Sequence, residues 1–367
     1  MSLKISIITA SYNSEKHLEQ TVCSVLEQTY SNIEYIIVDG ASSDGTTDII
    51  REYQRHIDHV ISESDKGIYD AFNKGVRMAT GDVIYFLNSD DYLCNDTVIE
   101  KVASAFVSSE TMVVYGDIVK WNEETGVFHH VSRPAELALL QQGKMPPHPG
   151  MFMRKCLIEQ YGYFNLDYTI ASDFDLVIKV FKDHLAQAVR IDERIAVFRT
   201  GGASTQLLKM RQVRDESVAI IESHFGTSDL KRYSQEEFNS FFNTKWLEIM
   251  LYKGHPASVT LIRKGIRDVA IFGSLETASY AHQDMQKSGI HVHVFMDNDL
   301  KRSGHQLNGV PISSPSWLSD NRSKIDAIIM AFGGNYEEEV KKQIKDLTVD
   351  HPVEIISWRE MIAWNFE

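Results

Sequence analysis

The sequence predicts an α/β protein with two α/β domains separated by helices. Short apolar runs alternate with helical patterns up to about residue 205, and the same alternation starts again at Asp268. Two amphipathic helical patterns lie between these regions. A chain of 367 residues is also too long for one ordinary hydrophobic core. We therefore expect an N-terminal domain over residues 1–205, a helical connector over 206–265 and a smaller domain over 266–367.

The composition is typical of a soluble globular protein, with 43% hydrophobic and 24% charged residues. A formal net charge of −14 argues against nucleic acid as the main partner and against polybasic attachment to anionic lipid. The sequence has no apolar run of membrane-spanning length, and it begins with a predicted strand rather than a signal peptide, so we expect a cytoplasmic protein. Cys23, Cys94 and Cys156 lack CxxC spacing, which favours a reducing compartment and argues against structural zinc.

The first β-loop-α unit places one aromatic side chain in the loop after its strand. Residues 4–10 read as a buried strand, and Ser14 caps the helix that follows. The loop from Thr9 to Asn13 contains Tyr12, whose ring is a candidate to stack on a nucleotide base. Packing of Tyr12 in the core is the alternative interpretation.

The second strand ends in an acidic, glycine-containing turn. Residues 36–38 form a short apolar run that is typical of a strand buried on both faces, and Asp39 follows at its carboxyl end. Ligands of open α/β sheets bind at that end, where a carboxylate can accept an N–H of a base or a ribose hydroxyl. Asp44 lies further along the turn, before the helix that Thr46 opens. The alternative is that Asp39 and Asp44 cap that helix.

Two further loops carry charged candidates. After a predicted strand at 59–62, Lys66 is the cation of a glycine-punctuated loop that can face a phosphate. After the buried strand at 83–87 come the adjacent carboxylates Asp90 and Asp91. Adjacent acids at the edge of a buried strand favour a cation between them, and oxygen ligands suit Mg²⁺ or Mn²⁺. The alternative is a solvated turn before the next helix.

The rest of the N-terminal domain supplies one more candidate carboxylate. Strands are predicted at 112–118, 126–131, 151–153 and 189–198. A helix that begins at Ser172 or Asp173 buries one face and leaves Asp173 at its N-terminal tip, where the helix dipole favours a negative charge. His148, in a proline-rich loop, is a candidate to contact a phosphate or an acceptor, or else a structural histidine.

The C-terminal region predicts a small Rossmann-like domain. A strand at 268–272 leads into Gly273, and a second strand ends at Asp297. The dinucleotide fingerprint is incomplete because Leu275 and Ala278 stand where glycines are needed. We therefore expect no NAD binding, and an oxidoreductase is poorly supported.

The N-terminal half resembles the nucleotide-sugar-dependent glycosyltransferases of family two, which have the GT-A fold. The resemblance covers roughly residues 3–205, and its motifs are residues 24–30, 36–46 and 87–91 in the family's order. It implies a GT-A type mixed sheet flanked by helices. It also implies the following roles: nucleotide contacts from Thr9, Tyr12, Asp39 and Asp44, diphosphate and metal contacts from Asp90 with Asp91 beside it, and Asp173 as the catalytic base. Asn88 and Ser172 depart from the family pattern, which often has Asp and Glu at these positions.

The predicted activity is metal-assisted transfer of a sugar from a nucleotide sugar, with UDP implied by the resemblance, to a hydroxyl of a glycan or lipid-linked acceptor. A single carboxylate acting on the acceptor predicts inversion at the anomeric carbon, because no covalent intermediate forms. Two other classes of protein remain open. A glycoside hydrolase would have no use for the nucleotide constellation, and a non-catalytic sugar-nucleotide binding protein would need Asp39 but not Asp173. Peripheral membrane association and a homodimer also remain open.

Overall fold

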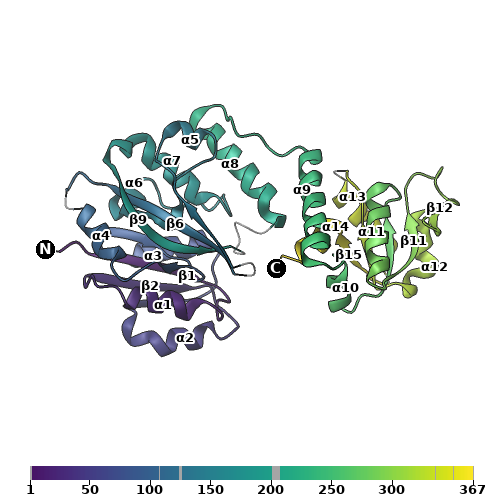
Figure 1. The fold of residues 1–367 in the computed structure, drawn as a ribbon, viewed down its shortest axis with the longest axis horizontal. Coiled ribbons are helices and arrows are strands. Elements are labelled where there is room, and N and C mark those ends of the chain that lie inside the picture. The colour runs from purple at the N-terminus through teal and green to yellow at the C-terminus, as the bar shows by residue number, and fades with distance from the viewer. Residues whose placement is uncertain are drawn as a thin grey trace. The chain divides into compact units, whose positions relative to one another are not determined.

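The computed structural model in Figure 1 describes residues 2–106, 108–123, 126–200, 207–334, 336–349 and 351–366. The chain divides into two compact units. The first unit comprises Met1–Thr205 and Gln212–Arg232, and the second comprises Gln206–Arg211 and Tyr233–Glu367. Each unit has its own sheet and flanking helices, which confirms the predicted α/β class.

The first unit is built on a mixed sheet that has nine strands within the described residues. Its strands lie in the order β3 (His59–Ser62), β2 (Ile33–Asp39), β1 (Ile5–Ser11), β4 (Val83–Phe86), β8 (Met151–Arg154), β6 (Val113–Asn122), β9 (Ala188–Arg199) and β5 (Tyr92–Leu93), and β7 (Val127–Val131) pairs with β6. Strands β3, β2, β1 and β4 are parallel, whereas β8 is antiparallel to β4. The carboxyl ends of the four parallel strands therefore meet at one edge of the sheet, as the sequence predicts.

Helices cover both faces of this sheet (Figure 1). They are α1 (Leu18–Leu26), α2 (Thr46–Tyr53), α3 (Ile68–Met78), α4 (Val98–Ala105), α5 (Leu137–Gln141), α6 (Lys155–Gln160), α7 (Ser172–His184) and α8 (Met210–Phe225). Side chains alternate between the two faces: Ile7 of β1 packs in a core with α1 and α4, and Ile8 packs in a core with α3 and α7. This alternation explains why the central strands read as continuous apolar runs.

The segment predicted as a connector is divided between the two units. Residues 212–232, which include most of α8, belong to the first unit, where Ile220 and Ile221 are fully buried. Helix α9 (Gln235–Glu248) belongs to the second unit. Residues 205 and 206, at the predicted boundary, lie outside the described residues. The roles assigned to the three segments remain predictions.

The second unit contains a six-stranded sheet, counted over the described residues. The order is β12 (Gln306–Leu307), β13 (Val310–Ser313), β11 (His291–Met296), β10 (Asp268–Phe272), β14 (Ala327–Met330) and β15 (Glu354–Ser357). All of these strands are parallel except β12. In chain order the parallel strands run 3-2-1-4-5, which is the arrangement of a Rossmann sheet.

Helices α9, α10 (Val259–Arg263), α11 (Glu276–Lys287), α12 (Leu318–Asn321), α13 (Glu337–Leu347) and α14 (Trp358–Ala363) belong to the second unit, together with a π-helical turn at Ile249–Lys253. Gly273, after β10, has a φ of +116°, and a Cβ there would lie 2.6 Å from the carbonyl oxygen of Ala331. Glycine is therefore required for β10 and the end of β14 to approach one another.

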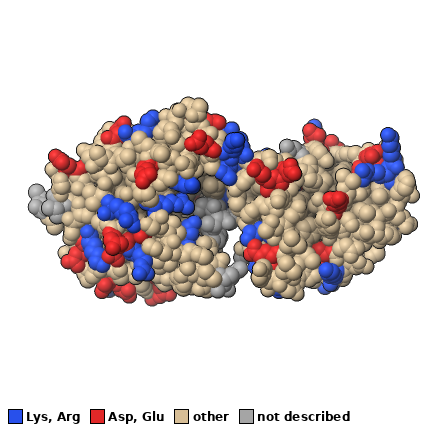
Figure 2. All heavy atoms as spheres, turned by 45° about the horizontal axis from the view of Figure 1, so that its top comes forward, with Lys and Arg blue, Asp and Glu red and all other residues tan. Residues whose placement is uncertain are grey.

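Within the described part of the chain, no helix is both long enough and apolar enough to span a bilayer. Figure 2 shows acidic side chains spread over the face drawn, with Lys and Arg side chains between them. On that face the acidic excess of the sequence is therefore dispersed.

Candidate active site

Asp39 lies at the carboxyl edge of the first sheet, opposite Ser11 of β1 and Ser62 of β3. Its side chain is fully buried. One carboxylate oxygen accepts hydrogen bonds from the hydroxyls of Ser11 (3.3 Å) and Ser42 (2.5 Å), and the other accepts from the Ser42 N–H (3.1 Å) and the Ser62 hydroxyl (2.8 Å). These four bonds use the acceptor positions of the carboxylate. A nucleotide that bonded to Asp39 would therefore have to displace a serine donor.

Asp44 joins the loops that follow β1 and β2. It accepts the N–H of Glu15 (3.1 Å) and both the N–H (3.1 Å) and the hydroxyl (2.5 Å) of Thr46. Desolvation raises the pKa of Asp44, but these hydrogen bonds outweigh it and lower the pKa below its ordinary value. Glu15 in turn accepts the N–H of Gly45 at 3.0 Å. These contacts support the capping alternative for Asp44, and a direct nucleotide contact stays a prediction.

Tyr12, Gly40 and an unpredicted residue, Asp65, lie beside one another. Tyr12 is 67% exposed, which contradicts the core-packing alternative and leaves its ring accessible for stacking. A Cβ on Gly40 would lie 2.7 Å from Asp65 Oδ2 and 3.4 Å from the Tyr12 ring, so the absence of a side chain at Gly40 lets the other two approach. Thr9, by contrast, is buried, with its hydroxyl 3.2 Å from that of Tyr35.

Lys66 is exposed in the turn before α3. Its N–H donates to Asp70 (3.1 Å), and Asp65 accepts the N–H of Gly67 (2.8 Å). These two hydrogen bonds fix the backbone of the turn. The long side chain of Lys66 is exposed to solvent. Its predicted phosphate contact remains a prediction.

Asp90 and Asp91 differ in how the protein surrounds them. Asp91 is fully buried and accepts the backbone N–H of Arg199 (3.0 Å) and the side-chain amide of Asn88 (3.2 Å). Burial and the neighbouring Asp90 charge raise the pKa of Asp91 well above its ordinary value. Asp90 is partly exposed, burial raises its pKa, and no other described side chain donates a hydrogen bond to its carboxylate. Asp90 is therefore the carboxylate available to a ligand.

This arrangement fits a metal ion that takes few protein ligands. No group of three or more His, Cys, Asp or Glu side chains able to hold a metal occurs among the residues that the structure describes. Mg²⁺ and Mn²⁺ can be held by one or two carboxylates, with phosphate oxygens and waters as the other ligands. Asp90 suits that role better than Asp91, whose oxygens already accept hydrogen bonds.

Arg199, which the sequence analysis did not single out, is a buried cation next to these acids. Its side chain is 5% exposed and lies between the rings of Tyr92 (5.1 Å) and Trp121 (5.0 Å). The guanidinium donates to the backbone carbonyl of Asp90 at 2.5 Å and to the side chain of Gln20. The available signal was an arginine directly after the strand predicted at 189–198 and before two glycines, and residues 201–206 lie outside the described residues.

Asp173 lies in the first turn of α7 and is held from α3. The hydroxyl of Tyr69 donates to Asp173 Oδ1 at 2.8 Å. Burial, the Asp173 charge and this hydrogen bond raise the pKa of Tyr69 well above its ordinary value, so the tyrosine stays protonated as a donor. Because Tyr69 begins α3 just beyond β3, this contact brings Asp173 to the carboxyl edge of the parallel strands.

His148 lies at the same edge, before β8. Its ring stacks on Phe86 at 5.6 Å and also contacts Phe72 and Phe164. Burial lowers the pKa of His148, although the Asp173 charge partly offsets that effect, so the imidazole is neutral near pH 7. The aromatic surroundings favour the structural interpretation of this histidine.

Two family models match the chain. Glycosyl transferase family 2 matches residues 6–172, and a family described as C2185-like, N-terminal, matches residues 265–355. The first match includes Asp39, Asp90 and Asp91 and ends one residue before Asp173.

Curated relatives are similar to about half of the chain. The PGL/p-HBAD biosynthesis glycosyltransferase of Mycobacterium bovis (strain BCG / Pasteur 1173P2) is 30% identical over 188 residues, which cover 48% of this chain and 70% of the relative. An uncharacterized glycosyltransferase of Nostoc sp., alr2836, is 29% identical over 221 residues, which cover 56% of this chain and 67% of the relative. Among solved structures, S. aureus TarS 1-349 in complex with UDP is 18% identical with a TM-score of 0.49, over 70% of this chain and 75% of that one.

Proposed function

The chain belongs to glycosyl transferase family 2 and is a glycosyltransferase, and we propose that it moves a sugar, with inversion, from a nucleoside-diphosphate sugar to an acceptor hydroxyl. The observation that carries this proposal is the pair of carboxylates at one sheet edge with different environments. Asp90 is partly exposed beside the buried Arg199, and Asp173 is held by Tyr69. Two carboxylates in separate environments suit two separate roles.

The diphosphate would lie beside Asp90. A divalent cation, Mn²⁺ or Mg²⁺, held by Asp90 and by the donor's phosphates would act as a Lewis acid that stabilises the negative charge of the leaving diphosphate. Arg199 holds the backbone of Asp90 in place through a 2.5 Å hydrogen bond. Asp91 supports the same turn by accepting the backbone N–H of Arg199.

Asp173 would remove the proton of the acceptor hydroxyl as it attacks the anomeric carbon. The hydrogen bond from Tyr69 orients one oxygen of Asp173, which leaves the other oxygen to accept the proton. A single displacement of this kind inverts the anomeric centre, so an α-linked donor would give a β-linked product. An α-linked product identified by NMR would contradict this mechanism.

The base of the nucleotide would lie against the exposed ring of Tyr12 and over Gly40, with Asp39 and Asp65 as the nearby acceptors. A carboxylate acceptor suits the N–H groups of several bases, so UDP is proposed on the family resemblance alone. We propose that the acceptor is a hydroxyl group of a glycan or of a lipid-linked molecule.

A panel of nucleotide sugars, assayed for release of nucleoside diphosphate with and without Mn²⁺, tests the proposal. We expect one donor to be turned over in a metal-dependent manner, and loss of turnover in Asp173→Asn. Tight donor binding with no turnover under any condition would instead favour a non-catalytic sugar-nucleotide binding protein.

A further inference from the structure

We propose that Glu216, on α8, is a positioning residue for Asp173, a role that rests on the proposed function of Asp173 as the base. Glu216 is 43 positions beyond Asp173 in the chain and lies outside the segment that the glycosyltransferase family model matches. Its carboxylate nevertheless lies against the backbone that leads into α7.

Four donors from three consecutive residues converge on the Glu216 carboxylate. Oε1 accepts the N–H (3.2 Å) and the hydroxyl (2.9 Å) of Thr169, and Oε2 accepts the N–H groups of Ile170 (3.0 Å) and Ala171 (3.0 Å). The side-chain amide of Gln212, one turn earlier on α8, donates to Oε1 at 3.0 Å. The whole turn that precedes α7 is therefore bound to one side chain.

Thr169 and Ile170, which supply three of these donors, precede α7 and are not part of the helix. Ala171 is the N-cap residue of α7, and its carbonyl accepts the first intrahelical hydrogen bonds, from Phe174 and Asp175. A negative charge at this position also interacts favourably with the helix dipole. Glu216 thus fixes, from another helix, the segment that leads into α7, whose N-cap residue makes no side-chain capping hydrogen bond.

The helix that carries Glu216 is itself fixed to α7. Ile220 and Ile221 are fully buried in the core shared with α7, and His224 Nε2 lies 2.7 Å from Asp175 Oδ1. Lys182 of α7 donates to the carbonyl of His224 at 3.0 Å. Glu216 is therefore presented by a packed element and not by a mobile loop.

Asp173 is consequently held at two points. Tyr69 binds its side chain from α3, and Glu216 binds the backbone two to four residues before it from α8. A base must be placed to within a fraction of an ångström of the proton that it accepts, and a displacement of about 1 Å can cost about 10²-fold in rate. Loss of the Glu216 contacts would let the start of α7 move while leaving Asp173 chemically intact.

Hydrogen exchange of the full-length chain tests the structural half of this proposal. In Glu216→Gln the side chain keeps its size but presents an NH₂ group to N–H donors, so we expect the amides of residues 169–171 to exchange at least about tenfold faster. His224→Asn, which removes the side-chain contact between His224 and Asp175, is the matched control and should leave those three amides unchanged. Unchanged exchange in Glu216→Gln would overturn the proposal.

A double-mutant cycle tests the catalytic half, with nucleoside diphosphate release from the donor that the panel identifies. Glu216→Gln should lower kcat about 10- to 100-fold with the donor KM within about threefold, whereas His224→Asn should stay within about twofold of wild type. In an Asp173→Asn background, Glu216→Gln should have less than about a twofold further effect, because it acts through Asp173.

Equal effects of Glu216→Gln in both backgrounds would show a purely structural role and overturn the proposal. A wild-type chain that turns over no donor would instead contradict the proposed function. The exchange measurement would still decide whether Glu216 holds the start of α7, so the two failures are distinguishable.

Discussion

The two units present parallel strands with polar groups at their carboxyl edges, but they use those groups differently. In the first unit, Asp90 is partly exposed and Tyr12 is largely exposed. In the second unit, the carbonyls that end β14 are bonded within the protein: Asn239 of α9 donates to Gly333 at 2.9 Å, and the Trp358 indole donates to Phe332 at 3.2 Å.

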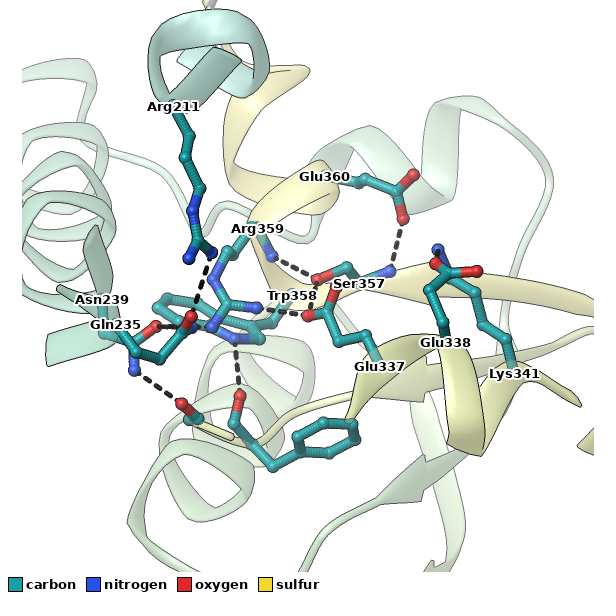
Figure 3. Close-up of polar contacts among 12 residues, drawn as sticks. Arg211, Gln235, Asn239, Glu337, Glu338, Lys341, Ser357, Trp358, Arg359 and Glu360 are labelled. Carbon is teal, nitrogen blue, oxygen red and sulfur yellow. Dashed lines mark hydrogen bonds and ion pairs between the residues drawn. The ribbon is translucent and has the colours of Figure 1, made fainter. Parts of the chain in front are cut away.

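Figure 3 shows polar side chains near the carboxyl edge of the second unit's sheet that bond to other groups of the same unit. Arg359 is 5% exposed, donates to Glu337 and Asn239, and lies 5.0 Å from the Trp358 ring. Glu337 also accepts the hydroxyl of Ser357 at 3.0 Å. The buried charge of Arg359 is paired with Glu337, because a buried charge without a partner would destabilise the fold. A Rossmann strand order does not by itself identify a ligand site, because a site depends on which groups the edge leaves open.

The comparison predicts that the first unit functions without the second, provided that α8 is retained. A fragment of residues 1–205 lacks Glu216, Ile220 and Ile221 and should fail to fold cooperatively, because Ile220 and Ile221 fill the core under α7. A fragment of residues 1–232 should melt cooperatively and release nucleoside diphosphate. Circular dichroism and the release assay measure both. Equal melting temperatures for the two fragments would show that α8 is dispensable.

Replacing a carboxylate by alanine should impair donor binding and turnover at the edge of the first sheet but leave both unchanged at the edge of the second sheet. Asp90→Ala should abolish metal-dependent donor binding and lower turnover by about 10²- to 10³-fold, because it removes the open oxygen ligand. Asp297→Ala, after β11 in the second unit, is the matched control and should stay within about twofold, since Asp297 bonds to Ser274 and the Asp299 N–H. Donor titration by calorimetry measures binding, and a large loss in Asp297→Ala would refute the assignment of the chemistry to the first unit.

Asp173→Asn should separate chemistry from binding. We expect turnover to fall by about 10²-fold or more, while donor affinity stays within about tenfold of wild type. Asp183→Asn, at the other end of α7, serves as the control because Asp183 accepts a hydrogen bond from Tyr161 on the surface. Equal loss of donor affinity and turnover in Asp173→Asn would remove Asp173 from the catalytic step.

The smallest effect on activity is expected at Glu34, near the opposite, amino edge of the first sheet. Desolvation raises its pKa, but hydrogen bonds from Ser6, Thr80 and Lys4 outweigh this and lower the pKa to about 2. A lowered folded-state pKa stabilises the protein above the unfolded value and loses that effect as the pH falls. Glu34→Gln should therefore lower the melting temperature at pH 7, with a gap to wild type that narrows between about pH 4 and pH 2.

Turnover of Glu34→Gln at pH 7 should stay within about twofold of wild type when it is assayed below its melting temperature. A constant gap in melting temperature across that pH range would show that the Glu34 charge does not contribute to stability.

Local sequence signals predicted the strands of the first sheet other than β5, the acidic turns and the first turn of α7. Asp39 could be found because it directly follows the apolar run 36–38, and Asp90 because it lies three residues beyond the apolar run 83–87. The signals could not separate Asp90 from Asp91, since the difference comes from the N–H of Arg199, 108 residues away. Glu216 and the membership of α8 in the first unit depend in the same way on tertiary contacts that no local pattern encodes.

A crystal structure of the full chain with UDP and Mn²⁺, with the metal located by its anomalous scattering, tests the central claim most directly. We predict a Mn²⁺ ion in direct contact with the Asp90 carboxylate and the diphosphate, and a base against Tyr12. Nucleotide bound at the Gly273 edge of the second unit, or in the first unit with Mn²⁺ away from Asp90, would contradict the account.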